Sequence, residues 1–175
     1  MNEFEFTLKF KLPQRYTDTD AVIEALASGG CTDAVVGLGL SGRIALTFTR
    51  NAKSALDAVA SASADVKRAI PGAKFIEATP DLVGLTDLAD IIGCSRQNMR
   101  KLVLASGPGF PSPIHDGKLA LWRLAAVLAW LKQTDRYDID EQWFDVARVT
   151  RQLNISREVV DLNLQVDDKL RRLVS

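Results

Sequence analysis

The sequence predicts an α+β protein in three parts: an N-terminal sheet domain, a small helical domain and a C-terminal helical segment. Residues 3–12 alternate polar and apolar side chains, which is typical of a half-buried strand. Residues 82–132 instead show short helical patterns around a Gly- and Pro-rich stretch. With 47% hydrophobic and 25% charged residues among 175, a core can form, which excludes disorder over the whole chain.

Residues 1–80 are expected to contain six elements in the order strand, helix, strand, strand, helix, strand. These are a strand at 3–12, a helix capped at Asp18–Asp20 and ending at Gly29-Gly30, a hairpin of strands 33–40 and 43–50 about Ser41-Gly42, an Ala-rich helix opening at Asn51 and ending at Pro71-Gly72, and a strand at 74–78. This order is that of a ferredoxin-like βαββαβ domain, with helices on one face of an antiparallel sheet. We expect a sensing or assembly role for this domain.

The glycines of the predicted hairpin also fit the spacing of a dinucleotide-binding loop, Gly37-Leu-Gly39-Leu-Ser-Gly42. Such a loop must open a helix, whose N-terminal amides hold the pyrophosphate. Here the β-rich run Arg43–Arg50 follows instead. We therefore interpret these glycines as turn residues and predict no cofactor site.

Residues 85–104 predict a helix-turn-helix. Thr86 is expected to cap a first helix ending at Ile92, and Gly93-Cys94 to form the turn. Ser95 then caps a second helix, in which Met99, Leu102 and Val103 face inward. Its outward residues are three cations and two amides without an acid: Arg96, Gln97, Asn98, Arg100 and Lys101. Cations neutralise phosphates, and Arg, Gln and Asn can bond base edges bidentately, so this helix suits a DNA major groove.

A hairpin is expected after the second helix. Residues 106–113 are rich in Gly and Pro, and Asp116-Gly117 is a strong hairpin-turn signal. A hairpin at this place is a wing, whose tip, with His115 and Lys118, can lie against the DNA backbone or minor groove. The aromatic and aliphatic residues that follow are interpreted as core: Trp122, Val127 and Trp130.

Four stretches of this part of the chain are Leu85–Leu102, Phe110-Pro-Ser-Pro-Ile, Trp122-Arg123 and Val127-Leu-Ala-Trp-Leu131. Together they resemble the MerR-like winged helix-turn-helix domain of excisionases and AlpA-type prophage regulators. The resemblance covers about 50 of the 175 residues. It implies sequence-selective DNA binding by a transcriptional regulator or a recombination accessory protein. This chain departs from the small excisionase-type proteins in the long segments on both sides of the domain and in Asp116 at the wing tip. The predicted DNA-contacting residues are Ser95, Arg96, Gln97, Asn98, Arg100, Lys101, His115, Lys118 and Arg123.

The charges of the chain balance, with 22 Lys and Arg against 22 Asp and Glu, which argues against a nonspecific nucleic-acid coat. The balance is not uniform along the chain. Residues 1–80 hold nine of each sign, residues 81–133 hold six cations against four acids, and residues 134–175 hold seven against nine. The only positive segment is thus the predicted DNA reader, which with so small an excess would bind weakly alone. We expect a homodimer on paired half-sites.

The C-terminal segment, residues 134–175, is predicted to be helical and can supply the dimer contact or pack within the chain. Asp140 caps a helix with an apolar face wide enough to pack on the body. Ser156 with Glu158 is expected to open a second helix. Its apolar stripe falls at spacings of 3, 4, 4 and 3 and suits a helix–helix seam, within the chain or between two copies: Val159, Leu162, Val166, Leu170 and Leu173.

The remaining inventory excludes several classes of protein. Cys31 and Cys94 lack C-x-x-C spacing and His115 is the single histidine, so we expect buried free thiols, no metal and no disulfide. No nucleophile–base pair stands at readable spacing, so an enzyme is not expected. The N-terminus lacks signal-peptide character, and the longest apolar stretch, 119–131, is too short to span a bilayer. We expect a cytoplasmic protein without membrane contact.

Three functions are compatible with these patterns. The first is a sequence-specific regulator that binds double-stranded DNA, with a protein or small molecule as partner of its N-terminal domain. The second is an excision or recombination accessory protein using the same DNA reader. The third is a protein-interaction adaptor, antitoxin-like or partner-neutralising, in which a free edge of the N-terminal sheet accepts a strand of the partner.

Overall fold

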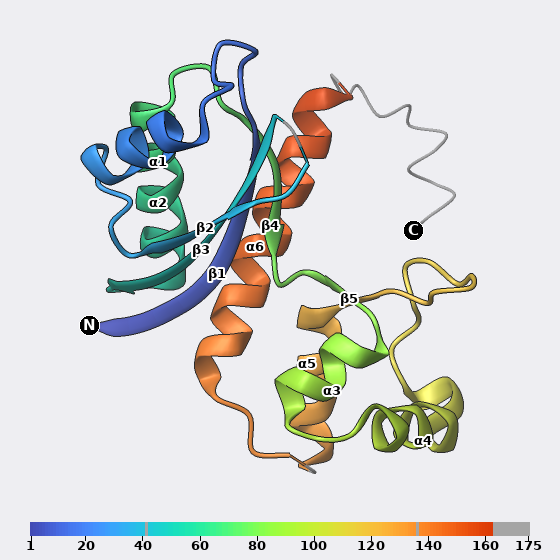
Figure 1. Cartoon of the computed structure of the whole chain (residues 1–175). Helices are drawn as coiled ribbons and strands as arrows, with labels where there is room; N and C mark the ends of the chain where they lie inside the picture. The colour runs from blue at the N-terminus through green and yellow to red at the C-terminus, as the bar shows by residue number, and fades with distance from the viewer. Residues whose placement is uncertain (41, 136, 163–175) are drawn as a thin grey trace.

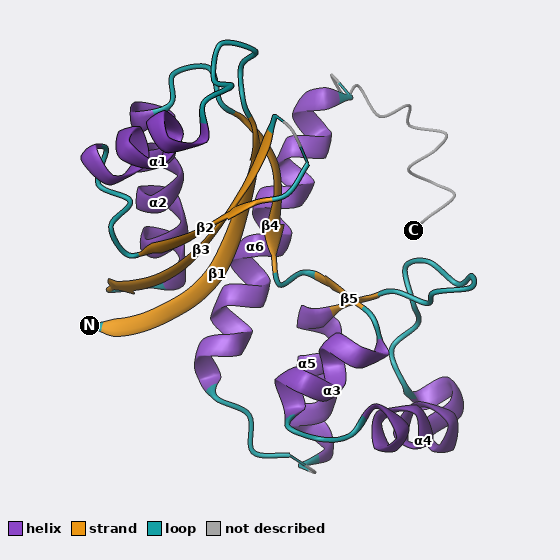
Figure 2. Cartoon of the chain, in the orientation of Figure 1, coloured by secondary structure: helices purple, strands orange, loops and turns teal. Residues whose placement is uncertain are grey.

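We describe the fold from a computed structural model, for residues 1–40, 42–135 and 137–162. The chain is mixed α/β, with an N-terminal sheet and several helices (Figures 1 and 2). The first six elements follow in the predicted order: β1 Asn2–Lys11, α1 Thr19–Ser28, β2 Ala34–Leu38, β3 Arg43–Ala52, α2 Ala55–Ala69 and β4 Lys74–Thr79. The later elements are β5 Leu82–Val83, α3 Leu85–Ile92, α4 Arg96–Ser106, the 3₁₀ turn η1 Gly107–Gly109, β6 Trp122–Arg123, α5 Leu124–Thr134 and α6 Glu141–Asp161.

The N-terminal sheet is antiparallel, with strand order β2-β3-β1-β4. Strand β1 lies in the centre because its even-numbered residues, Phe4 to Leu12, are apolar and become buried together. Helices α1 and α2 cover that face (Figure 1). The odd-numbered residues of β1 form the other face, where Thr7 hydrogen-bonds Thr47 and Lys9 pairs with Glu77 at 2.8 Å.

The two edges of this sheet differ. Among the described residues, no strand lies beyond β2, and Val35 in it is 75% exposed. Strand β4 is covered by α6, whose side chains take up its free backbone groups. Asn154 accepts from Ala78 N–H and donates to Ala78 C=O, and Arg157 donates to Ile76 C=O at 2.8 Å. Such a cover satisfies an edge that would otherwise be free to pair with another chain.

A second core lies under α3, α4, α5 and α6, and it is separate from the core of the sheet. Leu88, Met99, Leu124 and Leu128 are fully buried in it. The predicted core positions are confirmed, since Trp122 and Val127 are buried and Trp130 packs against them. Helix α6 joins the two cores: Val146 belongs to the first and its neighbour Ala147 to the second.

The structure confirms some of the predicted helix starts and corrects others. The predicted caps Asp18, Ser95 and Asp140 are confirmed by hydrogen bonds to the first turns of α1, α4 and α6. The predicted start of α2 at Asn51 is wrong, because β3 continues through Ala52 and Ser54 is the cap. Thr86 is not the cap of α3; Gly84 holds that position, and its N–H donates to the Asp87 carboxylate at 2.8 Å.

No second helix opens at Ser156. Helix α6 continues through this residue to Asp161, and the Ser156 hydroxyl donates to the Gln152 carbonyl one turn earlier. Of the predicted apolar stripe, Val159 and Leu162 are exposed. Its other members, Val166, Leu170 and Leu173, lie outside the described residues.

Candidate nucleic-acid interface

Helix α4 is fixed on one side and free on the other. The Ser95 hydroxyl accepts from Asn98 N–H at 3.1 Å, which satisfies one of the unpaired amides of the first turn. Met99 is fully buried and Leu102 is 8% exposed, so the helix is held by two residues three positions apart. The turn before it uses Gly93 at φ 74°, a left-handed conformation that glycine adopts without strain.

The free side of α4 carries the predicted polar set. Arg96, Gln97, Asn98, Arg100 and Lys101 are all exposed. Within the part of the chain that the structure describes, none of the three cations forms an ion pair. Figure 1 shows α4 at an outer corner, with α3 between it and α5. The helix thus presents three uncompensated positive charges and two amides to solvent along its 11 residues.

The segment after α4 is anchored by aromatic contacts. The Phe110 ring lies edge-on to Trp122 at 6.1 Å and to Trp130 at 5.0 Å between centroids. The indole N–H of Trp122 donates to the Pro111 carbonyl at 3.0 Å. These contacts hold the start and the end of residues 110–122 against α5.

Residues 115–121 form a loop closed by a single bridge, not the predicted hairpin with a two-residue turn. Leu121 N–H donates to the His115 carbonyl at 2.9 Å, and the strand that follows Leu121, β6, pairs with β5 and not with the other arm of the loop. The His115 ring lies over Gly117, where an added Cβ would stand 2.6 Å from Nε2. His115, Asp116 and Lys118 are exposed, so the loop presents both signs of charge.

The structure does not present Arg123 as a free cation on this surface, which argues against its predicted contact with DNA. Its side chain is 13% exposed and forms an ion pair with Asp81, which is 1% exposed. The Asp81 backbone carbonyl accepts from Leu124 N–H at 2.7 Å, at the start of α5. The cation is thus compensated by a buried carboxylate, unlike the three cations of α4.

The surroundings of Asp81, at the predicted boundary between residues 1–80 and 81–133, form a polar junction whose contacts the sequence did not predict. Asn154 donates to Asp81 Oδ2 at 2.8 Å, and the Thr150 hydroxyl donates to the Pro80 carbonyl at 2.6 Å. Strands β5 and β6, two residues each, pair beside it and were not predicted. The junction therefore ties together the end of β4, the start of α5 and the middle of α6. The sequence contained one sign of these contacts, because Asn154 is a polar residue on the otherwise apolar face of α6.

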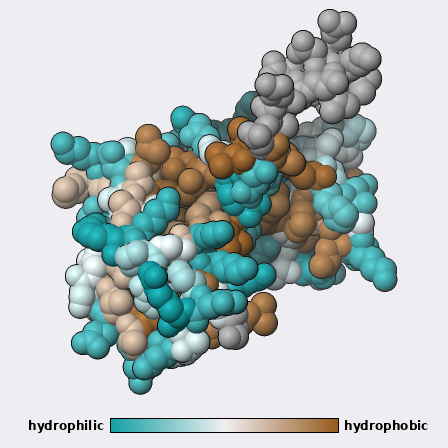
Figure 3. All heavy atoms as spheres, turned by 90° about the horizontal axis from the view of Figure 1, so that it is seen from above, coloured by the Kyte–Doolittle hydropathy of each residue, from teal (hydrophilic) through white to brown (hydrophobic). Residues whose placement is uncertain are grey.

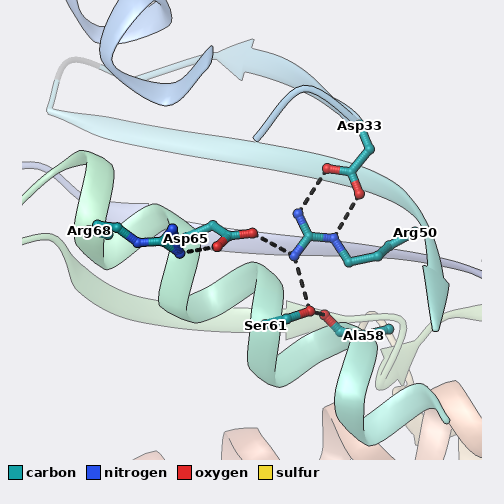
Figure 4. A network of polar contacts seen from close by, with 6 residues as sticks. All are labelled: Asp33, Arg50, Ala58, Ser61, Asp65 and Arg68. Carbon is teal, nitrogen blue, oxygen red and sulfur yellow. Dashed lines mark hydrogen bonds and ion pairs between the residues drawn. The ribbon is translucent and has the colours of Figure 1, made fainter. Parts of the chain in front are cut away.

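A second buried polar cluster lies in the N-terminal unit (Figure 4). Arg50 donates from Nε and a terminal nitrogen to both oxygens of Asp33, at 2.7 and 2.9 Å, and from its other nitrogen to Asp65 and Ser61. These bonds hold the pKa of the Asp33 carboxyl below its ordinary value and raise that of Arg50. The cluster links the start of β2, the end of β3 and α2. Arg50 is 9% exposed, which is consistent with a structural role.

The two thiols are free, and they differ in exposure. Cys31 is buried, and burial together with the neighbouring Asp65 carboxylate raises the pKa of its thiol. Cys94 is half-buried, directly before the Ser95 cap of α4, so the prediction of two buried thiols holds for Cys31 only. Among the described residues, no three His, Cys, Asp or Glu side chains are grouped to hold a metal ion. The same residues contain no helix long and apolar enough to cross a membrane.

Comparisons with family models, with curated proteins and with solved structures found no match to this chain. The candidate interface is therefore defined by geometry and charge alone: the exposed face of α4, together with the 115–121 loop that follows it in the sequence.

Proposed function

We propose that this chain is a sequence-specific DNA-binding protein that acts as a transcriptional regulator, with α4 as its recognition helix. In this proposal residues 81–133 are a winged helix-turn-helix domain and residues 1–80 a ferredoxin-like domain. The observation that carries the proposal is the composition of the exposed face of α4. Arg96, Arg100 and Lys101 have no acidic partner among the described residues, and Gln97 and Asn98 lie beside them.

The dimensions and chemistry of α4 fit a major groove. A helix of 11 residues is about 16 Å long, and the groove is about 12 Å wide and admits one helix. Lys101 suits a phosphate, and Arg96 and Arg100 suit the O6 and N7 acceptors of guanine. Gln97 and Asn98 can bond the N6 and N7 edge of adenine. The 115–121 loop would then lie on the adjacent backbone, with Lys118 toward a phosphate.

In this proposal the positively charged surface that contacts DNA is small and is limited to α4 and the 115–121 loop. Asp87 and Asp90 on α3 and Asp116 in the loop are exposed acids of the same segment, and they offset part of its positive charge. With about three phosphates neutralised, log affinity would fall with log salt at a slope of about −3 per copy. Binding at physiological salt then requires two copies on paired half-sites, which light scattering of the free protein and of its DNA complex would show.

The test is the double variant Arg96→Ala with Arg100→Ala, measured by fluorescence anisotropy on duplexes that the natural chain selects from a random pool. Loss of two bidentate base contacts should weaken specific binding by about 100-fold or more. The matched control is Lys67→Ala with Arg151→Ala, which removes the same charge from exposed positions on α2 and α6. Unchanged circular dichroism with undiminished binding in the α4 variant would overturn the proposal.

One observation favours the adaptor as a second candidate. Among the described residues β2 is an unpaired sheet edge, and it contains neither a charged residue nor proline, the residues that usually block edge pairing. Thr49 N–H donates to Asp33 C=O, so alternation along the ladder turns the backbone groups of Val36 outward. Two results would favour this function over DNA binding. The natural chain would select no duplex, and the Val35→Lys variant would no longer bind a purified partner protein that the natural chain binds.

A further inference from the structure

A cavity of about 740 Å³ lies at the end of the N-terminal sheet, away from α4. It is formed where the segment between β1 and α1 meets the hairpin of β2 and β3. Leu12 N–H donates to the Gly42 carbonyl at 2.8 Å, which ties the hairpin to the end of β1. Figure 3 shows the surface at this end of the molecule, where apolar and polar side chains lie side by side. A volume of this size is in the range of small-molecule sites, about 300 to 1,000 Å³.

One wall of the cavity is apolar. Leu12 and Val22 contribute buried surface from β1 and α1, at 8% and 2% exposure. Leu38 and Leu40, on the hairpin, are 42% and 71% exposed. The two hairpin leucines leave apolar area in water that a ligand in the cavity would cover, at a gain of about 25 cal/mol for each Å².

The charged part of the lining contains two cations on neighbouring strands. Lys11 and Arg43 are directly opposite each other in the register of β1 and β3, and both line the cavity. Like charges opposite each other destabilise a sheet. Within the described residues neither cation has an ion-pair partner. The acid in the lining, Asp18, uses Oδ1 to cap α1, accepting from Asp20 N–H at 2.9 Å and Ala21 N–H at 3.4 Å.

We propose that this cavity binds a small organic carboxylate with an apolar tail, its carboxylate between Lys11 and Arg43 and its tail against Leu38 and Leu40. The anion would relieve the cross-strand repulsion, and the tail would cover the leucines. Such a site gives the N-terminal domain a small-molecule ligand. The inference does not depend on DNA binding, because no residue of α4 contributes to the cavity.

The test uses three probes, hexanoate, octanoate and 4-phenylbutyrate, each beside its uncharged primary amide. Thermal unfolding of the full chain is followed at about 10 mM probe, a concentration that detects millimolar binding through the stabilisation of the native state. At least one acid should raise the Tm above the value with its amide. Isothermal titration should then give a Kd about ten-fold weaker in Lys11→Met with Arg43→Met than in the natural chain.

Folding of the variant is checked by its Tm without probe. Removal of the repulsion predicts an unchanged or higher value, and Lys67→Met with Arg151→Met serves as the control for loss of charge elsewhere. Leu40→Asp, which places an acid in the apolar wall, should also abolish the acid-specific shift. Any of three results would overturn the inference. The Tm could rise equally with an acid and with its amide, the variant of Lys11 and Arg43 could bind the acid as tightly as the natural chain does, or no probe could change the Tm. DNA binding by the same variant should stay unchanged, so the failure of one proposal is distinguishable from failure of the other.

Discussion

The side-chain amide of Asn154 closes both free backbone hydrogen bonds of Ala78, accepting its N–H at 2.7 Å and donating to its carbonyl at 2.8 Å. One residue of α6 thereby takes the place of a neighbouring strand at the β4 edge. The same Nδ2 donates to the buried Asp81 carboxylate. This arrangement couples the sheet, α6 and the junction with the second core.

Replacement of Asn154 by Ala should therefore be strongly destabilising. It leaves a buried N–H and a buried carbonyl of Ala78 without partners, at a cost of about 2 to 4 kcal/mol in the free energy of unfolding. Urea denaturation of the full chain measures this value. Gln152→Ala, two residues earlier and exposed, is the control and should change the free energy by less than about 0.5 kcal/mol. Similar values for both variants would contradict the role given to Asn154.

Arg123 should act through stability and not through DNA. Arg123→Met leaves the carboxylate of Asp81, 1% exposed, without its cation, at a cost of about 3 kcal/mol or more. Adding Asp81→Asn to this variant should restore part of the loss, because the buried charge is then removed. The affinity of the folded fraction for DNA should match that of the natural chain. If Arg123→Met has the stability of the natural chain but binds DNA more weakly, Arg123 is a DNA contact after all.

The pair of Asp33 and Arg50 predicts a pH dependence of stability. The folded pKa of Asp33 lies below its unfolded value because of hydrogen bonds from Arg50, so the stabilisation is complete above the unfolded pKa, about 4, and is lost as pH falls through the folded pKa. Asp33→Asn should cost about 1 to 2 kcal/mol at pH 7, and the difference from the natural chain should shrink at acid pH. The exposed Asp138→Asn is the control. If the difference in the free energy of unfolding between Asp33→Asn and the natural chain is the same at pH 7 and pH 3, the predicted pH dependence is wrong.

The thiols should separate by reactivity. Cys94 is half-buried, and Cys31 is 4% exposed with a raised pKa, so a disulfide reagent at pH 8 should modify Cys94 first. The second thiol should react about ten-fold more slowly or only on unfolding. Absorbance of the released thiolate follows both phases, and Cys94→Ser should remove the fast one. Two fast phases would show that Cys31 is accessible.

The parts of the fold that the sequence predicted are those with a local signal. The alternation of residues 3–12 predicted β1, and the capping residues Asp18, Ser95 and Asp140 marked three helix starts that the structure confirms. The cations of α4 were also predictable as exposed, since Met99 and Leu102 define the buried side by helical spacing.

The parts that were missed depend on contacts distant in the sequence. Strands β5 and β6 hold two residues each, too few for any periodicity, and pair across about 40 positions. Arg123 is cationic and follows a tryptophan, and nothing local tells that Asp81 neutralises it. Ser156 has the chemistry of a cap, but the residues before it pack on β4 and keep α6 helical. In these places tertiary contacts decided the structure against local preference.

The most direct test of the central claim is selection of DNA by the purified full chain from a pool of random duplexes at about 150 mM salt, in parallel with Arg96→Ala plus Arg100→Ala. If α4 is the recognition helix, the natural chain should enrich a recurring sequence, arranged as paired half-sites one helical turn apart, and the variant should enrich none while it stays folded. Enrichment of the same sequence by both proteins, or of no sequence by the natural chain, would contradict this claim.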